Sequence, residues 1–209
     1  MIETFGLSKR FGEKCAVDRL TLVAQPGEVT GFLGPNGSGK TTTIRLLMGL
    51  LRPSEGRASI LGRDCQTDGT ALKREVGYLP EDPFLYPYLT GRELLEFVAG
   101  LHGFSRPEAH RRAGEVLDRF GLVEDQGRFA VTYSLGMRKR LALAAALIHD
   151  PAVLVLDEPT NGLDPQGARE MRELMLSLAA QGRTVFLSTH LLDVADKICH
   201  RVAIIKAGL

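Results

Sequence analysis

Residues 34–41 read GPNGSGKT, and the segments on either side of this stretch indicate its structural context. Residues 27–33 are typical of a short buried strand, and residues 42–51 have helical spacing that puts Ile44 and Leu47 on one face. A strand, the pattern Gly-x-x-x-x-Gly-Lys-Thr and a helix, in that order, form the context that a phosphate-binding loop requires. The residues of this candidate phosphate loop are Gly34, Pro35, Asn36, Gly37, Ser38, Gly39, Lys40 and Thr41.

The residue types of the loop suit an anionic ligand. Glycines let successive backbone N–H groups point inward at phosphate oxygens, and the following helix adds the partial positive charge of its N-terminus. Lys40 supplies a mobile positive charge for the β- and γ-phosphates of a nucleotide, and the Thr41 hydroxyl is a candidate ligand of Mg²⁺. The plainer interpretation is a glycine turn before an ordinary helix, which the complete pattern and its flanking elements disfavour.

The whole chain has the size and composition of one domain, with room for an inserted subdomain. It has 209 residues, of which 44% are apolar, and a net charge of +1 with both signs interspersed. Without a basic stripe, nucleic acid is not expected as the main partner. Cys15, Cys65 and Cys199 lack metal-like spacing and fit a reducing compartment. The sequence shows no signal peptide and no apolar run near the roughly twenty residues of a membrane span, so membrane association is expected only through a partner.

The remaining segments predict a strand-rich core with a helical insertion. Strands are expected at 2–7, 17–23, 56–61, 75–79, 152–156, 184–188 and 201–205, and helices at 68–74, 90–103, 106–119 and 133–148. Thr90 is a candidate N-cap. Leu94, Leu95 and Leu101 belong to an apolar stripe on the helix that follows it. Residues 84–150 are therefore expected to form a helical subdomain inserted into the core.

Ionisable side chains follow two of the predicted buried strands. Asp157 and Glu158 come directly after residues 152–156, and His190 follows the strand at 184–188. Ligands bind outside the carboxyl ends of the strands in open α/β sheets, so these three side chains are candidate site residues. The other histidines are interpreted as structural or surface residues.

Two further residues have a plain and a functional interpretation. Ser134 stands where an N-cap is expected, and capping is its plain role. Phe11 lies in an otherwise polar turn, where it either folds back on the core or serves as a platform for a nucleotide base.

Together these motifs resemble the nucleotide-binding domain of an ATP-binding cassette (ABC) transporter, over essentially the whole chain. They occur in the family's order and at its spacing: the phosphate loop, the turn at Glu81, the signature segment 133–137, the Asp157-Glu158 pair, residues 161–164 (NGLD) and His190. The resemblance implies one nucleotide-binding domain over residues 1–209. Its expected fold is α/β, with a P-loop NTPase core in which helices flank a mixed or parallel sheet, an antiparallel β subdomain and the inserted helical subdomain.

Position by position, the resemblance implies a site for ATP and Mg²⁺. Thr42 joins the phosphate loop in holding the phosphates, and Phe11 stacks on the adenine, where the family more often has Tyr. Thr41 holds Mg²⁺, Asp157 helps to hold it through water, and Glu81 is placed to contact the metal or its water.

The resemblance also implies catalysis by a dimer. Glu158 acts as the general base, and His190 contacts the γ-phosphate and positions the attacking water. Ser134 and Gly136 act in trans, on the γ-phosphate bound to a second subunit in a head-to-tail dimer, and Asp164 lies at the dimer interface. The other implied partner is an integral membrane permease, which places the chain on the cytoplasmic face of a membrane.

Two departures from the family's usual motifs bear on function. Glu81 replaces the usual Gln and adds negative charge beside the γ-phosphate. The signature segment is Tyr-Ser-Leu-Gly-Met instead of Leu-Ser-Gly-Gly-Gln. This form, together with residues 85–93, resembles the branch that exports drugs, lipids, polysaccharides or ions, and favours export. The groove around Glu81 is expected to receive a helix of the permease, with Phe84, Leu85 and Tyr86 either in contact with it or buried in the subdomain.

Other functions stay open as alternatives. A soluble mechanical ABC ATPase usually carries two cassettes or long coiled-coil insertions, and neither is present in the sequence. An unrelated kinase would need an acceptor pocket, and a GTPase would need a guanine-reading Asn-Lys-x-Asp tetrapeptide, which is not found. A binding module without turnover is disfavoured by Glu158 and His190. The sequence ends soon after the last predicted strand, whereas relatives often continue, so a C-terminal truncation is a further interpretation.

Overall fold

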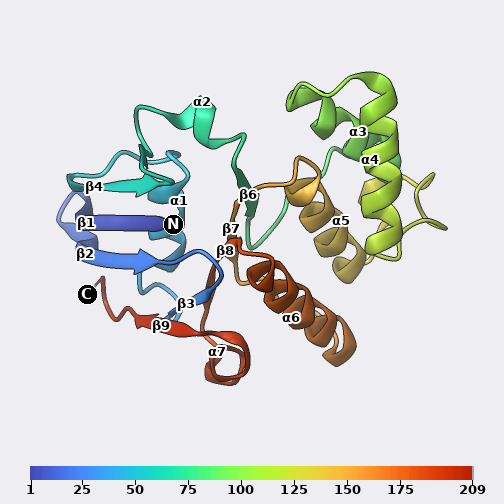
Figure 1. Ribbon diagram of the computed structural model, residues 1–209. Helices are drawn as coiled ribbons and strands as arrows, with labels where there is room; N and C mark the ends of the chain where they lie inside the picture. Colours follow the sequence, from blue (N-terminus) through green and yellow to red (C-terminus); the bar gives the residue numbers. More distant parts are fainter. Residues whose placement is uncertain (209) are drawn as a thin grey trace.

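The computed structural model describes residues 1–208 (Figure 1). A parallel sheet of five strands forms the centre, in the order β6 (Val76–Leu79), β7 (Val153–Asp157), β8 (Thr184–Thr189), β3 (Val29–Leu33) and β9 (Arg201–Ile204). Every residue of β3, β7 and β8 is buried, as expected for strands covered on both faces. Because the strands are parallel, their carboxyl ends meet at one edge of the sheet, and the α/β prediction is confirmed.

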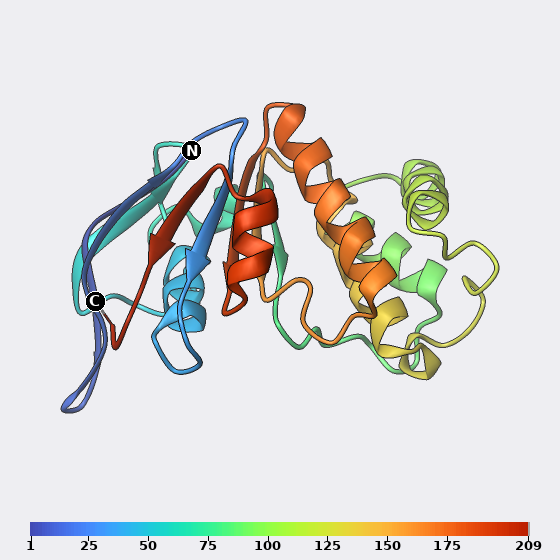
Figure 2. The same cartoon turned by 90° about the horizontal axis from the view of Figure 1, so that it is seen from below.

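Alternate residues of the central strands face two separate cores. Val153 and Val155 of β7 pack in one hydrophobic cluster, whereas Leu154 and Leu156 pack in the other. The helices that flank the sheet are α1 (Lys40–Leu47), α6 (Pro165–Ala180) and α7 (Leu192–Ile198). α1 contacts β7 on one side and β2 and β4 on the other, while α6 and α7 contact β3 and β8. Figure 2 shows α6 and α7 on the near side of the sheet in the view from below.

The second sheet is antiparallel and has the order β2-β1-β4-β5. Its strands are β1 (Ile2–Phe11), β2 (Lys14–Ala24), β4 (Glu55–Ile60) and β5 (Arg63–Asp64). β1 and β2 are longer than predicted, because they stay paired as far as Phe11 and Lys14. Register shifts after Thr4 and Leu7 break the alternation of apolar and polar residues along β1. The polar ends of the two strands therefore lack the alternation by which a strand is predicted from sequence.

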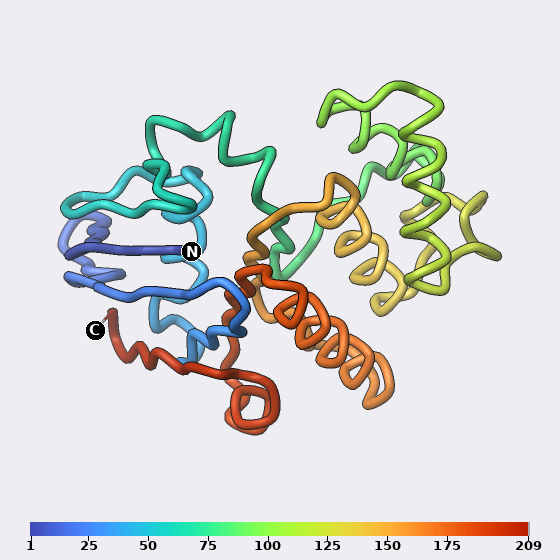
Figure 3. The backbone as a smooth tube through the Cα atoms, in the orientation of Figure 1, coloured from blue at the N-terminus to red at the C-terminus, as the bar shows by residue number. Residues whose placement is uncertain are grey.

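Helices fill the segment between β6 and β7 in the sequence. They are α3 (Gly91–Leu101), α4 (Arg106–Arg119), the 3-10 helix η1 (Ala130–Thr132) and α5 (Leu135–Leu147). Figure 3 shows the chain leaving β6 for this helical region and returning from α5 to β7. A short helix, α2 (Gly69–Leu72), precedes β6. Within the described residues, no helix is both long enough and apolar enough to cross a membrane.

The local signals at the helix ends are partly confirmed. Thr90 caps α3 in a reciprocal capping box with Glu93. The predicted apolar stripe of α3 is buried at Leu94 and Leu95, whereas Leu101, in the last turn, is 70% exposed at the edge of a groove. The helix predicted at 42–51 begins earlier and ends at Leu47, because Gly49 adopts a left-handed conformation two residues later.

Candidate active site

The phosphate loop joins the end of β3 to the start of α1, as the sequence predicted. Gly37 and Gly39 have φ angles of 78° and 114°, a region in which side chains with a Cβ are strained. A Cβ added at Gly39 would lie 2.3 Å from the carbonyl oxygen of Ala16, and one at Gly34 would lie 2.4 Å from that of Ile205. Backbone atoms therefore close in the loop at Gly34 and Gly39, and only glycine fits at these two positions.

Lys40 is buried and folds back over its own loop. Its ammonium donates to the carbonyl oxygens of Gly34 and Pro35, at 2.7 and 3.2 Å. The Ser38 hydroxyl is buried and has no hydrogen-bond partner. An unpaired buried hydroxyl is costly, so Ser38 offers a donor that a phosphate oxygen would satisfy.

Glu158 follows β7 and holds its carboxylate between two basic groups. Oε2 lies 3.0 Å from Nδ1 of His190, and Oε1 lies 3.4 Å from Nζ of Lys40. Although Oε1 is close to this ammonium, it accepts no hydrogen bond and is buried. Glu158 thus keeps a free acceptor beside the phosphate loop, which is the property that a general base needs.

Asp157 is fixed by the neighbouring strand. The hydroxyl of Ser188 donates to Asp157 Oδ1 at 2.5 Å and accepts a bond from the backbone N–H of Glu158 at 3.0 Å. Ser188 was not among the predicted site residues. A serine inside a buried strand gives no signal of its own, and only the pairing of β7 with β8 brings it to the acidic pair.

A cavity of about 550 Å³ opens over the phosphate loop. The residues that line it are Phe11, Lys14, Ala16, Asn36, Gly37, Gly39, Lys40, Thr41, Thr42, Glu81 and Glu158. Phe11 is 49% exposed, so it does not fold back on the core, and Lys9 Nζ lies 5.1 Å from its ring centroid. An exposed aromatic ring, a basic loop and a buried carboxylate thus share one cavity.

Few protein side chains near the cavity could serve as ligands of a metal ion. Thr41 and Glu81 line the cavity, whereas Asp157 does not line it and accepts a hydrogen bond from Ser188. Among residues 1–208, no group of three or more His, Cys, Asp or Glu side chains forms a metal site by itself. Mg²⁺ in nucleotide sites is usually bound by one or two protein groups together with phosphate oxygens and water, so this donor set fits Mg²⁺ that arrives with a nucleotide.

Three of the predicted residues lie apart from this cavity. Ser134 caps α5 by accepting from the N–H of Met137 at 3.3 Å, and Asp164 caps α6 by accepting from the N–H of Gly167 at 3.0 Å. Gly136 and Asp164 line a separate small cavity of about 180 Å³. The structure therefore does not bring Ser134, Gly136 and Asp164 to the phosphate loop of their own chain.

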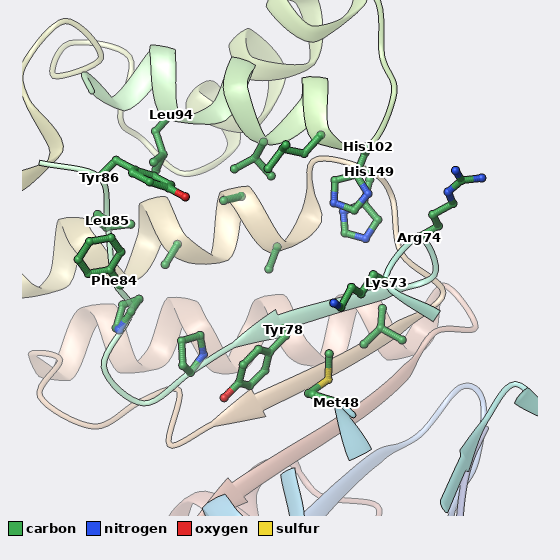
Figure 4. Close-up of a pocket in the computed structure, with 18 of the residues that line it drawn as sticks. Met48, Lys73, Arg74, Tyr78, Phe84, Leu85, Tyr86, Leu94, His102 and His149 are labelled. Atoms are coloured by element: carbon green, nitrogen blue, oxygen red, sulfur yellow. The ribbon is translucent and has the colours of Figure 1, made fainter. Parts of the chain in front are cut away.

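A larger groove of about 570 Å³, here called the apolar groove, lies between α3, α5 and β6. Figure 4 shows Phe84, Leu85 and Tyr86 at one end and the stacked rings of His102 and His149 at the other. Phe84 is 79% exposed and Tyr86 is also exposed, whereas Leu85 packs against the core. Burial in the subdomain thus applies to Leu85, whereas Phe84 and Tyr86 are exposed.

The histidine end of the apolar groove is basic. The rings of His102 and His149 stack with centroids 3.8 Å apart, and Lys73 and Arg74 lie beside them (Figure 4). Burial lowers the pKa of His149 to about 4, and burial followed by the charge of Arg74 lowers the pKa of His102. The two rings are therefore expected to stack as neutral imidazoles near pH 7.

Comparison with known proteins identifies the family. The ABC transporter family matches residues 17–161. The daunorubicin resistance ATP-binding protein DrrA3 of Streptomyces coeruleorubidus is 44% identical over 97% of this chain and 64% of its own length. The bacitracin transport ATP-binding protein BcrA of Bacillus licheniformis is 41% identical over 100% of this chain and 67% of its own length. The chain thus spans about two thirds of the length of these relatives.

The fold is that of solved ATP-binding cassettes. A dimeric cassette in a post-hydrolysis state, bound to ADP and Pi, has a TM-score of 0.92 and 27% identity, covering 100% of this chain and 95% of the other. The ATP-binding subunit of an ABC transporter has a TM-score of 0.91 and 33% identity, covering 100% and 87%. The chain belongs to the ABC transporter family, and its fold is that of the family's ATP-binding subunit.

Proposed function

We propose that the protein containing this chain hydrolyses ATP in a head-to-tail dimer and powers export through a separate membrane permease. The observation that carries the proposal is the carboxylate of Glu158, buried between Lys40 and His190 with one oxygen free of hydrogen bonds. A binding module without turnover has no use for a free buried base at this position.

The proposed reaction is the attack of water on the γ-phosphorus of ATP, with release of ADP and phosphate. Glu158 Oε1 accepts the proton of the attacking water, and His190, held by Oε2, orients that water. Lys40 exchanges its carbonyl partners for phosphate oxygens and neutralises their charge. Thr41 and Asp157 would hold Mg²⁺, which supplies further neutralisation of the phosphates when it is bound. Phe11 would stack on the base.

The proposed dimer explains the residues that lie apart from the cavity. Ser134 and Gly136 lie at the N-terminal end of α5, where free backbone N–H groups favour an anion. This end would contact the γ-phosphate held by the phosphate loop of a second subunit, with Asp164 beside it. The similarity to a dimeric cassette with bound ADP and Pi supports this arrangement.

The apolar groove is the proposed contact with the permease. Phe84 and Tyr86 expose aromatic rings at one end, and Lys73 and Arg74 make the other end basic. This pattern suits a cytoplasmic helix of the permease that carries an apolar face and an acidic group near one end. Export is favoured by the Tyr-Ser-Leu-Gly-Met signature segment and by the relatives, which include a Nod factor export protein at 40% identity.

The test is co-purification of the full-length tagged protein from native membranes in mild detergent. A stoichiometric polytopic protein is expected, and a variant with Phe84→Asp and Tyr86→Asp should lose it. Leu192→Asp is the control, because Leu192 is also an exposed apolar residue but lies on α7, outside the groove. A soluble protein without a membrane partner would favour the mechanical ATPase instead, and an unchanged complex in the double variant would remove the groove from the proposal.

A further inference from the structure

One buried lysine outside the phosphate loop has no role in the mechanism above. Lys139 lies on α5, five residues after the N-cap Ser134, and is only 2% exposed. Its ammonium donates to the carbonyl oxygens of Glu158 and Asn161, at 3.1 and 2.5 Å. Within residues 1–208, Lys139 makes no ion pair at salt-bridge distance. A buried ammonium is costly unless hydrogen bonds compensate its charge, and here the two carbonyl oxygens supply those bonds. The lysine and the two carbonyl groups therefore fix one another in place.

The bond to Glu158 acts on a strained part of the backbone. Glu158 has a φ angle of 47°, a left-handed conformation that is uncommon for a residue with a side chain. Such a conformation persists only where the surroundings fix it. Its N–H donates to the hydroxyl of Ser188, and its carbonyl oxygen accepts from the Lys139 ammonium and from the backbone N–H of Asn161, each at 3.1 Å. These bonds hold both polar backbone groups of Glu158, and Lys139 supplies the one that comes from α5.

The bond to Asn161 joins the same lysine to the loop that follows. Asn161 Nδ2 lies 3.4 Å from Glu81 Oε1, which links this loop to the turn beside the cavity. The loop also packs on the start of α5, since a Cβ added at Gly162 would lie 2.7 Å from Cδ2 of Leu135. Lys139 is thus the polar contact at the point where α5, the loop and the base meet.

Carboxylates surround this point without pairing with the lysine. Burial lowers the pKa of Lys139, and the negative charges of Glu81, Glu158 and Asp82 act in the opposite direction. The ammonium is therefore stabilised by the field of the acidic cluster as well as by its two carbonyl partners.

We propose that Lys139 is a positioning residue that ties α5, and with it Ser134, to the backbone of the general base Glu158 in the same subunit. The inference rests on the proposed ATPase function. In this proposal α5 contacts the nucleotide of the other subunit and also aligns Glu158 of its own subunit. When the dimer closes on one nucleotide, the movement of α5 changes the position of the general base in the other ATP site. Lys139 does not line the phosphate cavity, so its removal should alter turnover and leave ATP affinity unchanged.

The first test uses Lys139→Met in the full-length protein, with Lys197→Met as the control for the same substitution at an exposed position. We expect kcat to fall by about 10–100-fold, with the Kd for ATP within about threefold of wild type. Hydrogen exchange of the nucleotide-free protein should become faster at residues 158–163 and stay unchanged at residues 34–42. An unchanged kcat, or an equal loss of kcat and ATP affinity, would overturn the proposal.

The second test is a double-mutant cycle with Glu158→Gln. If Lys139 acts through Glu158, the double variant should hydrolyse ATP no more slowly than Glu158→Gln alone. Multiplied losses would instead assign Lys139 a separate role. The same experiment tests the ATPase function by itself, because the wild type should hydrolyse ATP and Glu158→Gln should not. A failure of the ATPase proposal can therefore be distinguished from a failure of the positioning role of Lys139. If Lys139→Met does not fold, Lys139→Gln keeps an uncharged N–H donor group and should give an intermediate kcat.

Discussion

Replacing Glu158 with Gln removes one charge from a buried cluster while it keeps the size of the side chain. In the structure the carboxylate lies between Lys40 and His190 and pairs with both. The variant should therefore show two separable effects. The general base is lost, and Lys40 loses its only anionic neighbour within salt-bridge distance among residues 1–208.

The geometry gives a magnitude for each effect. At 3.4 Å, the attraction between Lys40 and Glu158 is about 5 kcal/mol at an effective dielectric constant of about 20. Desolvation offsets part of it, and Lys40 keeps two carbonyl acceptors, so the free energy of unfolding should fall by about 3 kcal/mol at most. Loss of the base should slow hydrolysis by about 10²–10⁴-fold, equivalent to about 3–5 kcal/mol of activation free energy.

ATP affinity should rise in this variant, because the phosphates no longer face the carboxylate and no longer compete with it for Lys40. The assays are steady-state phosphate release, equilibrium ATP binding and urea unfolding without nucleotide. Glu173→Gln is the control, since Glu173 makes an exposed ion pair on α6. Turnover near the wild-type rate would remove Glu158 from its role, and a loss of ATP affinity would contradict the competition for Lys40.

Three further predictions concern the loop, a helix cap and pH. Gly39→Ala should weaken ATP binding more than Gly37→Ala in a binding titration, because the new Cβ meets a backbone carbonyl 2.3 Å away at Gly39 and open space at Gly37. Thr90→Ala should lower the free energy of unfolding by about 0.5–2 kcal/mol, and Ser105→Ala by less, because the Ser105 side chain makes no capping bond; equal losses in urea melts would contradict this. Burial lowers the pKa of His149 to about 4, so between about pH 6.5 and pH 4 the unfolded chain binds a proton that the folded chain does not. The free energy of unfolding should therefore be highest above about pH 6.5 and should decrease as the pH falls toward 4. Unfolding midpoints at about pH 7 and pH 5 should differ more for wild type than for His149→Phe.

The sequence predicts the phosphate side of the site well, because its motif is contiguous. A strand, a glycine loop, Lys40 and a helix follow one another along the chain, and the structure keeps them adjacent. The sequence also predicts that Asp157, Glu158 and His190 lie at one edge of the sheet, because parallel strands end at a common edge. Thr90 was found because a capping box is a local pattern.

The rest depends on contacts between distant segments. Ser188 and Lys139 carry no local signal, and only folding places them on the two sides of Glu158. The left-handed backbone of Glu158 could not be inferred, because glutamate rarely adopts it. The spacing places Leu101 on the same apolar stripe as Leu94 and Leu95, but it does not reveal that Leu101 is exposed at the end of that stripe.

We propose above that each ATP site combines the phosphate loop of one subunit with Ser134 of another. Mixing the inactive variants Lys40→Ala and Ser134→Asp tests it most directly, since Asp keeps the N-cap of α5 and repels the γ-phosphate. With random pairing, about half of the dimers are mixed, and each mixed dimer contains one intact site and one site that carries both substitutions. If the sites act independently, we expect the mixture to recover about one quarter of the wild-type rate. Activity no greater than the sum of the two variants would contradict the composite site.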